Sequence, residues 1–187
     1  MIRALYRASQ AGVEIDLIVR GQCALVPGRR GISSRIRVRS IVGRFLEHSR
    51  IFYCENGEDA EVYLGSADWM PWNLYERVEV LFPVKDSALW ERMCREILPY
   101  YLADTRKGRN LRQDGLYTHL RKGRRSRGFS VQEHLMKRAH VSVNGSGTCR
   151  GPQLAANYSS QHEAWHHPLE PRRSAEFEVE ESANATV

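Results

Sequence analysis

Two short motifs carry side chains suited to phosphate chemistry. One begins the first strand of an expected β-hairpin, and the other ends its second strand. A His-Ser-Arg motif occupies residues 48–50, and a Gly-Ser-x-Asp motif occupies residues 65–68. An imidazole attacks phosphorus or donates a proton near neutral pH, and a neighbouring guanidinium stabilises charge on phosphate oxygens. The polar groups of Ser66 and Asp68 are suited to orienting the ring. The spacing therefore predicts a phosphate-handling site around His48.

The segments around these motifs alternate between helix and strand patterns, which is typical of an α/β domain. Residues 48–69 are predicted to form the hairpin, with its turn at the ENGED sequence over 55–59. In chain order we expect a helix over 2–12, a strand over 13–20, a short strand over 35–39, a helical turn over 40–48, the hairpin, a strand over 75–84, a helix over 86–104 and an amphipathic segment over 129–140. This order favours a mixed β-sheet flanked by helices.

The expected helix over 86–104 follows an Asp-Ser pair that is suited to capping its amino terminus. Helical spacing places four large side chains on one face, which we expect to be core: Leu89, Met93, Ile97 and Tyr101. A basic stretch over 105–128 is predicted to be a connector without regular structure.

The charge distribution points to a polyanionic partner. Of the net charge of +6, residues 141–187, with three Arg and six Glu, contribute −3, so that the first 140 residues carry +9. Such a surplus attracts nucleic acid, phosphate chains or nucleotides, and charge alone does not choose among them. The four cysteines form no C-x-x-C pair, and no apolar run is long enough for a transmembrane segment. We therefore expect free thiols and a cytoplasmic protein.

The two motifs resemble those of the phospholipase D superfamily, in which H-x-K precedes a strand and G-S-x-N follows the next one. Longer stretches are similar to consecutive blocks of polyphosphate kinase, in the same order and spacing: residues 2–21, 36–57, 62–84 and 101–117. The segment FSVQEHLMKRAH at 129–140 resembles the closing helix of that family. The resemblance implies a phospholipase D-like α/β fold and reversible transfer of the terminal phosphoryl group of ATP to inorganic polyphosphate.

The resemblance also implies roles for individual residues. Arg20, in the LIVRG block, would contact nucleotide phosphates, and His48, in the FLEHSR block, would lie beside the transferred phosphate as proton donor or phosphate contact. Ser66 and Asp68 would hold His48 in one orientation. Four arginines would line a polyphosphate path: Arg37, Arg39, Arg44 and Arg50.

The same resemblance implies partners beyond this chain. Mg²⁺ would act with ATP, its ligands lying mainly elsewhere in the enzyme, and the family's phosphorylated histidine lies in a preceding domain. The chain is therefore expected to be an amino-terminally truncated fragment that is inactive alone and needs the amino-terminal part of the enzyme. The resemblance also implies a homo-oligomeric enzyme, which could associate with a membrane as part of a complex. Its expected parts are a catalytic domain over 1–120, a basic connector and closing helix over 121–140, and a disordered tail over 141–187.

The tail contains one pattern that competes with this interpretation. Residues 162–166 satisfy H-E-x-x-H, which in zinc proteases places two histidines one helical turn apart. Pro168 follows almost immediately, and the flanking sequence lacks a long amphipathic helix. We therefore expect no catalytic zinc site, and the pattern favours adventitious metal binding by His162, His166 and His167 instead.

Two other functions remain open at this point. One is a phosphodiesterase of the phospholipase D kind, with His48 as nucleophile and a second motif supplied by dimerisation. The other is a basic module that binds polyanions without catalysis and without specificity for nucleic acid. Binding by such a module would fall steeply with salt and would not depend on His48.

Overall fold

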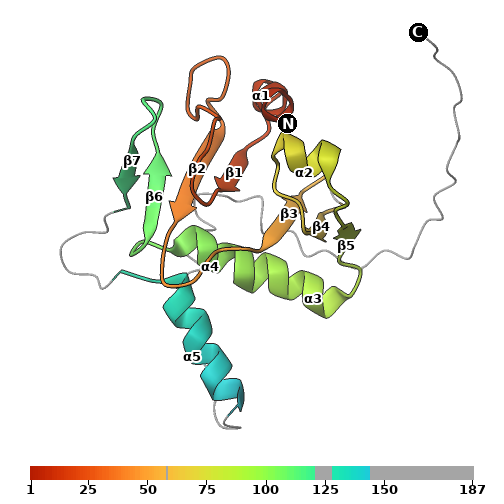
Figure 1. Ribbon diagram of the computed structural model, residues 1–187, viewed down its shortest axis with the longest axis vertical. Coiled ribbons are helices and arrows are strands. Elements are labelled where there is room, and N and C mark those ends of the chain that lie inside the picture. Colours follow the sequence, from red (N-terminus) through yellow and green to blue (C-terminus); the bar gives the residue numbers. More distant parts are fainter. Residues whose placement is uncertain (58, 121–127, 144–187) are drawn as a thin grey trace, which may run out of the picture.

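Two β-sheets lie next to each other in the computed structural model, with one long helical segment running beneath both (Figure 1). The structure describes residues 1–57, 59–120 and 128–143. Within them the chain alternates between helices and strands, as the sequence predicts. The prediction of an α/β domain with helices flanking the strands is confirmed, although the strands divide into two sheets.

The first sheet has the strand order β1-β2-β6-β7 and mixes parallel and antiparallel pairs. β1 (Ile15–Ile18) runs parallel to β2 (Ile36–Ile41), which is the pairing that a crossover connection allows. The antiparallel hairpin of β6 (Gly108–Leu111) and β7 (Tyr117–His119) extends the sheet beyond β2. This hairpin lies in the stretch for which a structureless connector is predicted, so that prediction is wrong there.

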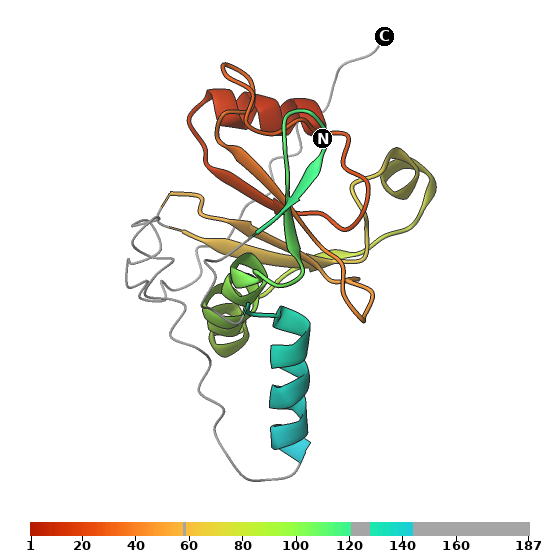
Figure 2. The ribbon, with the colours of Figure 1, turned by 90° about the vertical axis from the view of Figure 1, so that its left-hand side faces the viewer.

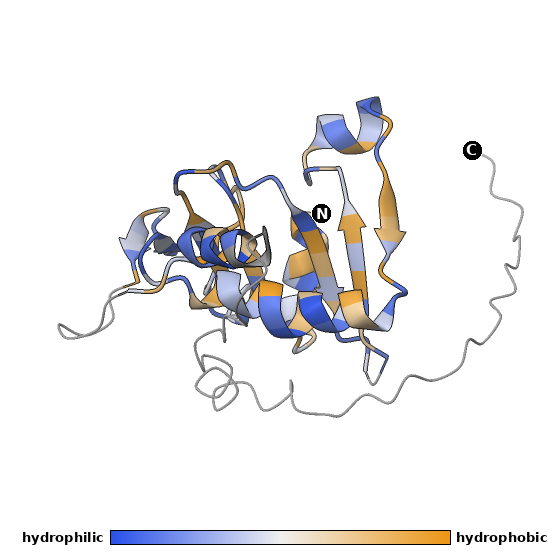
Figure 3. Ribbon diagram, turned by 90° about the horizontal axis from the view of Figure 1, so that it is seen from below, coloured by the Kyte–Doolittle hydropathy of each residue, from blue (hydrophilic) through white to orange (hydrophobic). Residues whose placement is uncertain are grey.

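The second sheet is antiparallel and has the order β3-β4-β5. β3 (Arg50–Cys54) and β4 (Glu61–Gly65) form the predicted hairpin, so the two phosphate motifs lie at its open end, where Arg50 pairs with Gly65. Between β4 and β5 (Leu81–Pro83) the chain forms the short helix α2 (Pro71–Glu76), because Pro71 is suited to a first helical turn. The observed strand is therefore much shorter than the strand predicted over 75–84. Figure 3 shows apolar stretches along the strands of this sheet.

Helices cover the sheets from several sides. α1 (Ile2–Gln10) packs Leu5 and Tyr6 against Leu25, Ile36 and Val38 of the first core cluster. Figure 2 shows α1 lying against the first sheet and α5 projecting away from both sheets. The helices beneath and beyond the sheets are α3 (Ser87–Arg92), a π-helical segment (Met93–Ile97), α4 (Leu98–Ala103) and α5 (Val131–Val143).

The helical segment beneath the sheets begins as predicted, with the Asp86 carboxylate accepting a hydrogen bond from the Leu89 backbone N–H at 2.8 Å. The predicted core face is wrong in part, because Leu89 is 50% exposed. The π-helical segment contains extra residues per turn and so rotates the buried face toward Cys94, Tyr100 and Leu102. Tyr100 joins Ile41 and Val131 in the second core cluster.

No helical turn forms at 40–48, contrary to the sequence prediction. Ser40 and Ile41 instead continue β2, where they pair with Arg109 and Gly108 of β6. The residues after Ile41 run without regular structure to β3, and side chains from distant helices bind their backbone. This segment, which we call the His48 segment (residues 42–49), carries the central residue of the predicted site.

Asp104 joins the end of α4 to the start of α5. Its carboxylate is fully buried and accepts hydrogen bonds from four backbone N–H groups, of Arg106, Lys107, Gly108 and Val131, at 2.7–3.2 Å. A buried N–H group without an acceptor lowers the stability of the fold. The Asp104 side chain alone supplies acceptors for four N–H groups.

Asp104→Ala is expected to lower the free energy of unfolding by about 3 kcal/mol or more, because several buried N–H groups lose their acceptor together. Urea unfolding of the 187-residue chain measures the change. Asp114→Ala is the matched control, since the exposed Asp114 accepts one backbone hydrogen bond, from Leu116, and we expect it to cost about 1 kcal/mol or less. Equal losses in the two variants would contradict the assignment.

Candidate functional site

Arg50 links the two predicted motifs. Its Nη1 lies 2.6 Å from His48 Nδ1 and also donates to the His48 carbonyl oxygen. Its Nη2 donates to Asp68 Oδ1 at 2.7 Å, and Asp68 lies three residues after the end of β4. The Arg50 side chain is only 11% exposed, so this ion pair is shielded on one side from water. The two motifs therefore form one site, with Arg50 between His48 and Asp68.

The contact with Arg50 defines which nitrogen of His48 carries the proton. A guanidinium has donors and no acceptor, so Nδ1 of His48 must accept the hydrogen bond. In the neutral ring the proton then resides on Nε2. Because the His48 side chain is exposed, Nε2–H is directed to a ligand or to solvent. The arrangement is suited to donating a hydrogen bond from Nε2. It is not suited to nucleophilic attack, because Nε2 carries the proton and the lone pair of Nδ1 is engaged by Arg50.

Arg20 lies beside His48, although 27 residues separate it from Glu47 in the chain. It follows β1, and its Nη1 donates to the carbonyl oxygen of Glu47 at 3.1 Å, which belongs to the peptide group that joins Glu47 to His48. The Arg20 side chain is exposed, and a guanidinium has five donors, so further N–H groups are available to a phosphate.

The structure distributes the other predicted arginines over two places. Arg37, in β2, binds both carboxylate oxygens of Asp16 at 2.8 Å and one oxygen of Glu14 at 3.1 Å. Arg39 lies two residues closer to the site, and its carbonyl oxygen accepts from the backbone N–H of Val19. The roles of Arg37 and Arg39 in a polyphosphate path stay predictions.

Arg44 lies within the His48 segment. Its guanidinium carbon is 5.5 Å from the centre of the Phe45 ring, and the side chain is exposed. Its role in a polyphosphate path stays a prediction.

Ser66 follows β4 directly, and its hydroxyl contacts Glu79 and Val80 instead of His48. Its hydroxyl donates to Glu79 and accepts from the backbone N–H of Val80 at 3.0 Å, while the Asn73 amide donates to Glu79 Oε1 at 2.8 Å. The hydrogen bonds from Ser66 and Asn73 lower the pKa of Glu79 below its ordinary value. Ser66 therefore closes the loop that carries Asp68 and α2, and Asp68 is joined to His48 through Arg50.

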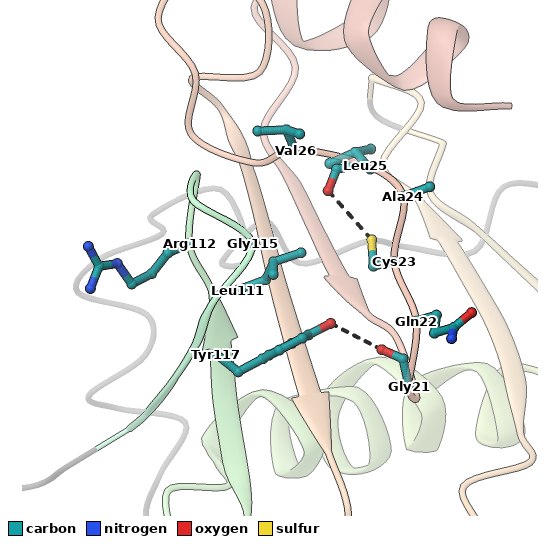
Figure 4. Close-up of a pocket in the computed structure, with 10 residues that line it drawn as sticks. All are labelled: Gly21, Gln22, Cys23, Ala24, Leu25, Val26, Leu111, Arg112, Gly115 and Tyr117. Carbon is teal, nitrogen blue, oxygen red and sulfur yellow. Dashed lines mark hydrogen bonds between the residues drawn. The ribbon is translucent and has the colours of Figure 1, made fainter.

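A cavity of about 320 Å³ lies next to Arg20, between residues 21–26 and the β6–β7 hairpin (Figure 4). The Tyr117 hydroxyl donates to the Gly21 carbonyl oxygen at 3.1 Å across it, and the Cys23 thiol contacts the Leu25 carbonyl oxygen. The predicted site residues do not line this cavity. Its hairpin wall anchors the chain that follows Arg20, which the sequence pattern did not predict.

Sequence reasoning also missed the residues that hold the His48 segment. Gln132 of α5 binds Phe45 and Glu47, and Tyr101 of α4 binds Glu47. A glutamine within an amphipathic helix gives no sign that it is buried, so only its place in the fold identifies it. Among residues 1–57, 59–120 and 128–143, no three His, Cys, Asp or Glu side chains gather as metal ligands, and none of the helices there is long and apolar enough to cross a membrane.

Comparison with solved structures defines the class of this fold. A polyphosphate kinase from Porphyromonas gingivalis matches 78% of this chain with a TM-score of 0.70 and 39% sequence identity, over 22% of its own length. Mixed strands in two sheets, flanked by helices, thus form a phospholipase D-like α/β domain of the kind found in that enzyme.

The chain belongs to the polyphosphate kinase family, since the family described as polyphosphate kinase C-terminal domain 2 matches residues 1–132. A polyphosphate kinase from Thermosynechococcus vestitus is 51% identical over 146 residues, and one from Pseudomonas aeruginosa is 57% identical over 120 residues. These matches cover 78% and 64% of this chain, which spans only 20% and 17% of the two relatives.

Proposed function

We propose that this chain supplies the nucleotide and phosphate contacts of an ATP:polyphosphate phosphotransferase. The observation that carries the proposal is the meeting of Arg20 with the peptide group of His48, beside a histidine that presents Nε2–H. A cationic donor and a neutral N–H donor side by side are suited to a phosphoryl group on which charge is building up. Membership of the family supports ATP as the phosphoryl donor.

In the proposed reaction, the bond between the γ-phosphorus of ATP and the β–γ bridging oxygen breaks, and ADP leaves. The phosphoryl group then passes to the terminal oxygen of a polyphosphate chain, directly or through a phosphohistidine elsewhere in the enzyme. Arg20 would hold phosphate oxygens, and His48 Nε2–H would donate to the oxygen that gains charge. Arg50 would keep the imidazole in that tautomer, with Asp68 holding Arg50. This arrangement disfavours a phosphodiesterase with His48 as nucleophile.

Mg²⁺ belongs to the proposal only through the bound nucleotide. The described residues do not offer a cluster of metal ligands. A divalent cation would accompany the ATP phosphates and neutralise part of their charge.

The chain spans about a fifth of its relatives' length, so we propose that the full reaction needs the segments that those relatives possess in addition. We propose residues 1–120 as the catalytic unit, with α5 attached to it, within a homo-oligomeric enzyme located in the cytoplasm. The predicted connector at 121–127 and the predicted tail beyond residue 143 lie outside the described residues.

Polymer formation from γ-labelled ATP tests the proposal. The purified chain is assayed alone and mixed with the part of the Pseudomonas aeruginosa polyphosphate kinase that lies outside the match. We expect label in polymer from the mixture alone, and a loss of about a hundredfold with Arg20→Ala, because a charge-assisted phosphate contact is removed. Arg95→Ala, which loses an exposed ion pair with Glu91, is the control. Salt-sensitive polyphosphate binding without label transfer would instead indicate a polyanion-binding module.

A further inference from the structure

The His48 segment is held by the side-chain amide of Gln132, the second residue of α5. Gln132 is 8% exposed. Its Oε1 accepts from the Phe45 backbone N–H at 3.1 Å, and its Nε2 donates to the Phe45 carbonyl oxygen at 2.9 Å. These are the two hydrogen bonds that a neighbouring strand would make to Phe45. One amide thus replaces a strand partner for a stretch of backbone without regular structure.

Glu47 is bound by two helices at once. Its carboxylate accepts from Gln132 Nε2 and, at 2.6 Å, from the Tyr101 hydroxyl of α4. Burial and the hydrogen bond to Glu47 raise the pKa of Tyr101, so its phenol stays protonated and remains a donor. The carbonyl oxygen of this same Glu47 accepts the hydrogen bond from Arg20. Side chain and backbone of Glu47 therefore connect α4 and α5 to the phosphate contacts.

Gly43 provides the close approach that this arrangement needs. A Cβ atom at Gly43 would lie 2.2 Å from Gln132 Oε1, well inside contact distance. A larger residue would push the amide away from Phe45. The backbone at Gly43 has no positive φ, so the requirement comes from space at Gln132 and not from backbone conformation.

We propose that Gln132 is a positioning residue for the phosphate site. Together with Gly43 and Glu47, it sets the place of the His48 segment against α5, and through that segment the places of Arg20 and His48. The inference rests on the proposed function. It means that the start of α5 affects phosphate binding indirectly, since Gln132 itself would not contact the phosphate. A loss of this contact moves both phosphate contacts at once, because they share the Glu47–His48 peptide group.

Gln132→Glu in the 187-residue chain tests the proposal. The new carboxylate keeps the shape of the amide, cannot donate to the Phe45 carbonyl oxygen, and faces the Glu47 carboxylate. We expect the Kd for tripolyphosphate, measured by calorimetry, to rise about tenfold. We also expect the Phe45 amide to exchange its hydrogen at least about tenfold faster and the NMR signals of the His48 ring to change. Adding Glu47→Gln restores an amide–carboxylate pair and is expected to recover much of the affinity.

Two further variants separate positioning from general stability. Glu133→Gln changes the next residue of α5, whose carboxylate binds the exposed Arg106, and is expected to leave tripolyphosphate affinity and Phe45 exchange unchanged. Gly43→Ala displaces the Gln132 amide without altering a polar group, and is expected to reproduce the loss should Gln132→Glu fail to fold.

Wild-type affinity and Phe45 protection in a folded Gln132→Glu chain would overturn the proposal, as would an equal loss in Glu133→Gln. If the wild-type chain binds no tripolyphosphate, the proposed function loses its support. Phe45 exchange and the His48 ring signals then still show whether Gln132 holds the segment, so the two failures are distinguishable.

Discussion

His48→Ala is expected to reduce label transfer into polymer by about 10²- to 10³-fold in the reconstituted mixture, the range for removing one positioned N–H donor to an oxygen that gains charge. The substitution removes Nε2–H, which Arg50 keeps protonated by occupying Nδ1. It leaves Arg20 and its contact with the Glu47 carbonyl oxygen in place, so nucleotide binding should weaken far less than the rate of transfer. Initial rates over a range of ATP concentrations separate the effect on kcat from that on KM.

His48→Gln is the matched comparison, because a side-chain amide offers an N–H donor near the position of Nε2 but does not release a proton. We expect it to bind ATP like the wild-type chain and to recover part of the transfer rate that His48→Ala loses. A His48→Gln variant as slow as His48→Ala would mean that an N–H donor at this position does not account for the role of His48. An unchanged rate in His48→Ala would remove His48 from the site altogether.

Arg50→Lys is expected to lower the rate of label transfer by about a hundredfold although the charge is kept, because an ammonium does not replace the planar fork of a guanidinium. Arg50 Nη1 binds His48 and Nη2 binds Asp68, and a single lysine nitrogen cannot hold both positions. The His48 ring should then lose its preference for the Nε2–H tautomer. Ring nitrogen chemical shifts of the 187-residue chain measure the tautomer without any ligand.

Asp68→Asn acts on the same arrangement from its other end. It keeps an acceptor for Arg50 and removes the charge, so we expect a smaller loss than for Arg50→Lys, about tenfold, with part of the tautomer preference retained. The control for arginine replacement in general is Arg95→Lys. Arg95 lies in the π-helical segment and forms an exposed ion pair with Glu91 of α3. Wild-type transfer in Arg50→Lys together with an unchanged ring tautomer would show that Arg50 does not orient His48.

Local sequence pattern predicted the elements whose stability comes from near neighbours. The hairpin of β3 and β4 follows from alternating residues and an Asn-Gly turn, and the start of α3 follows from the Asp86 cap. The hairpin in turn brings the residues at 48–50 and 65–68 together, because strand pairing places Arg50 opposite Gly65. The meeting of His48, Arg50 and Asp68 at one site was therefore within reach of sequence reasoning.

Elements that depend on distant partners were missed or misassigned. β6 and β7 pair with each other and with β2, and their short basic sequence has little strand preference of its own. The residues at 40–48 have apolar spacing that favours a helical turn, yet Ser40 and Ile41 gain more by pairing with β6. The π-helical segment rotated the buried face of its helix, which no periodicity of 3.6 residues anticipates.

The residue types around His48 determine what chemistry the chain is suited to, because the donors and acceptors of imidazole, guanidinium and carboxylate are properties of the side chains themselves. Their relative placement depends on contacts that join residues far apart in the chain. Gln132 binds Phe45 across 87 residues, and Arg20 reaches the Glu47 carbonyl oxygen across 27. Such contacts form only when the sheets and α5 pack together, so the tertiary structure alone decided where the His48 segment lies and which distant side chains hold it there.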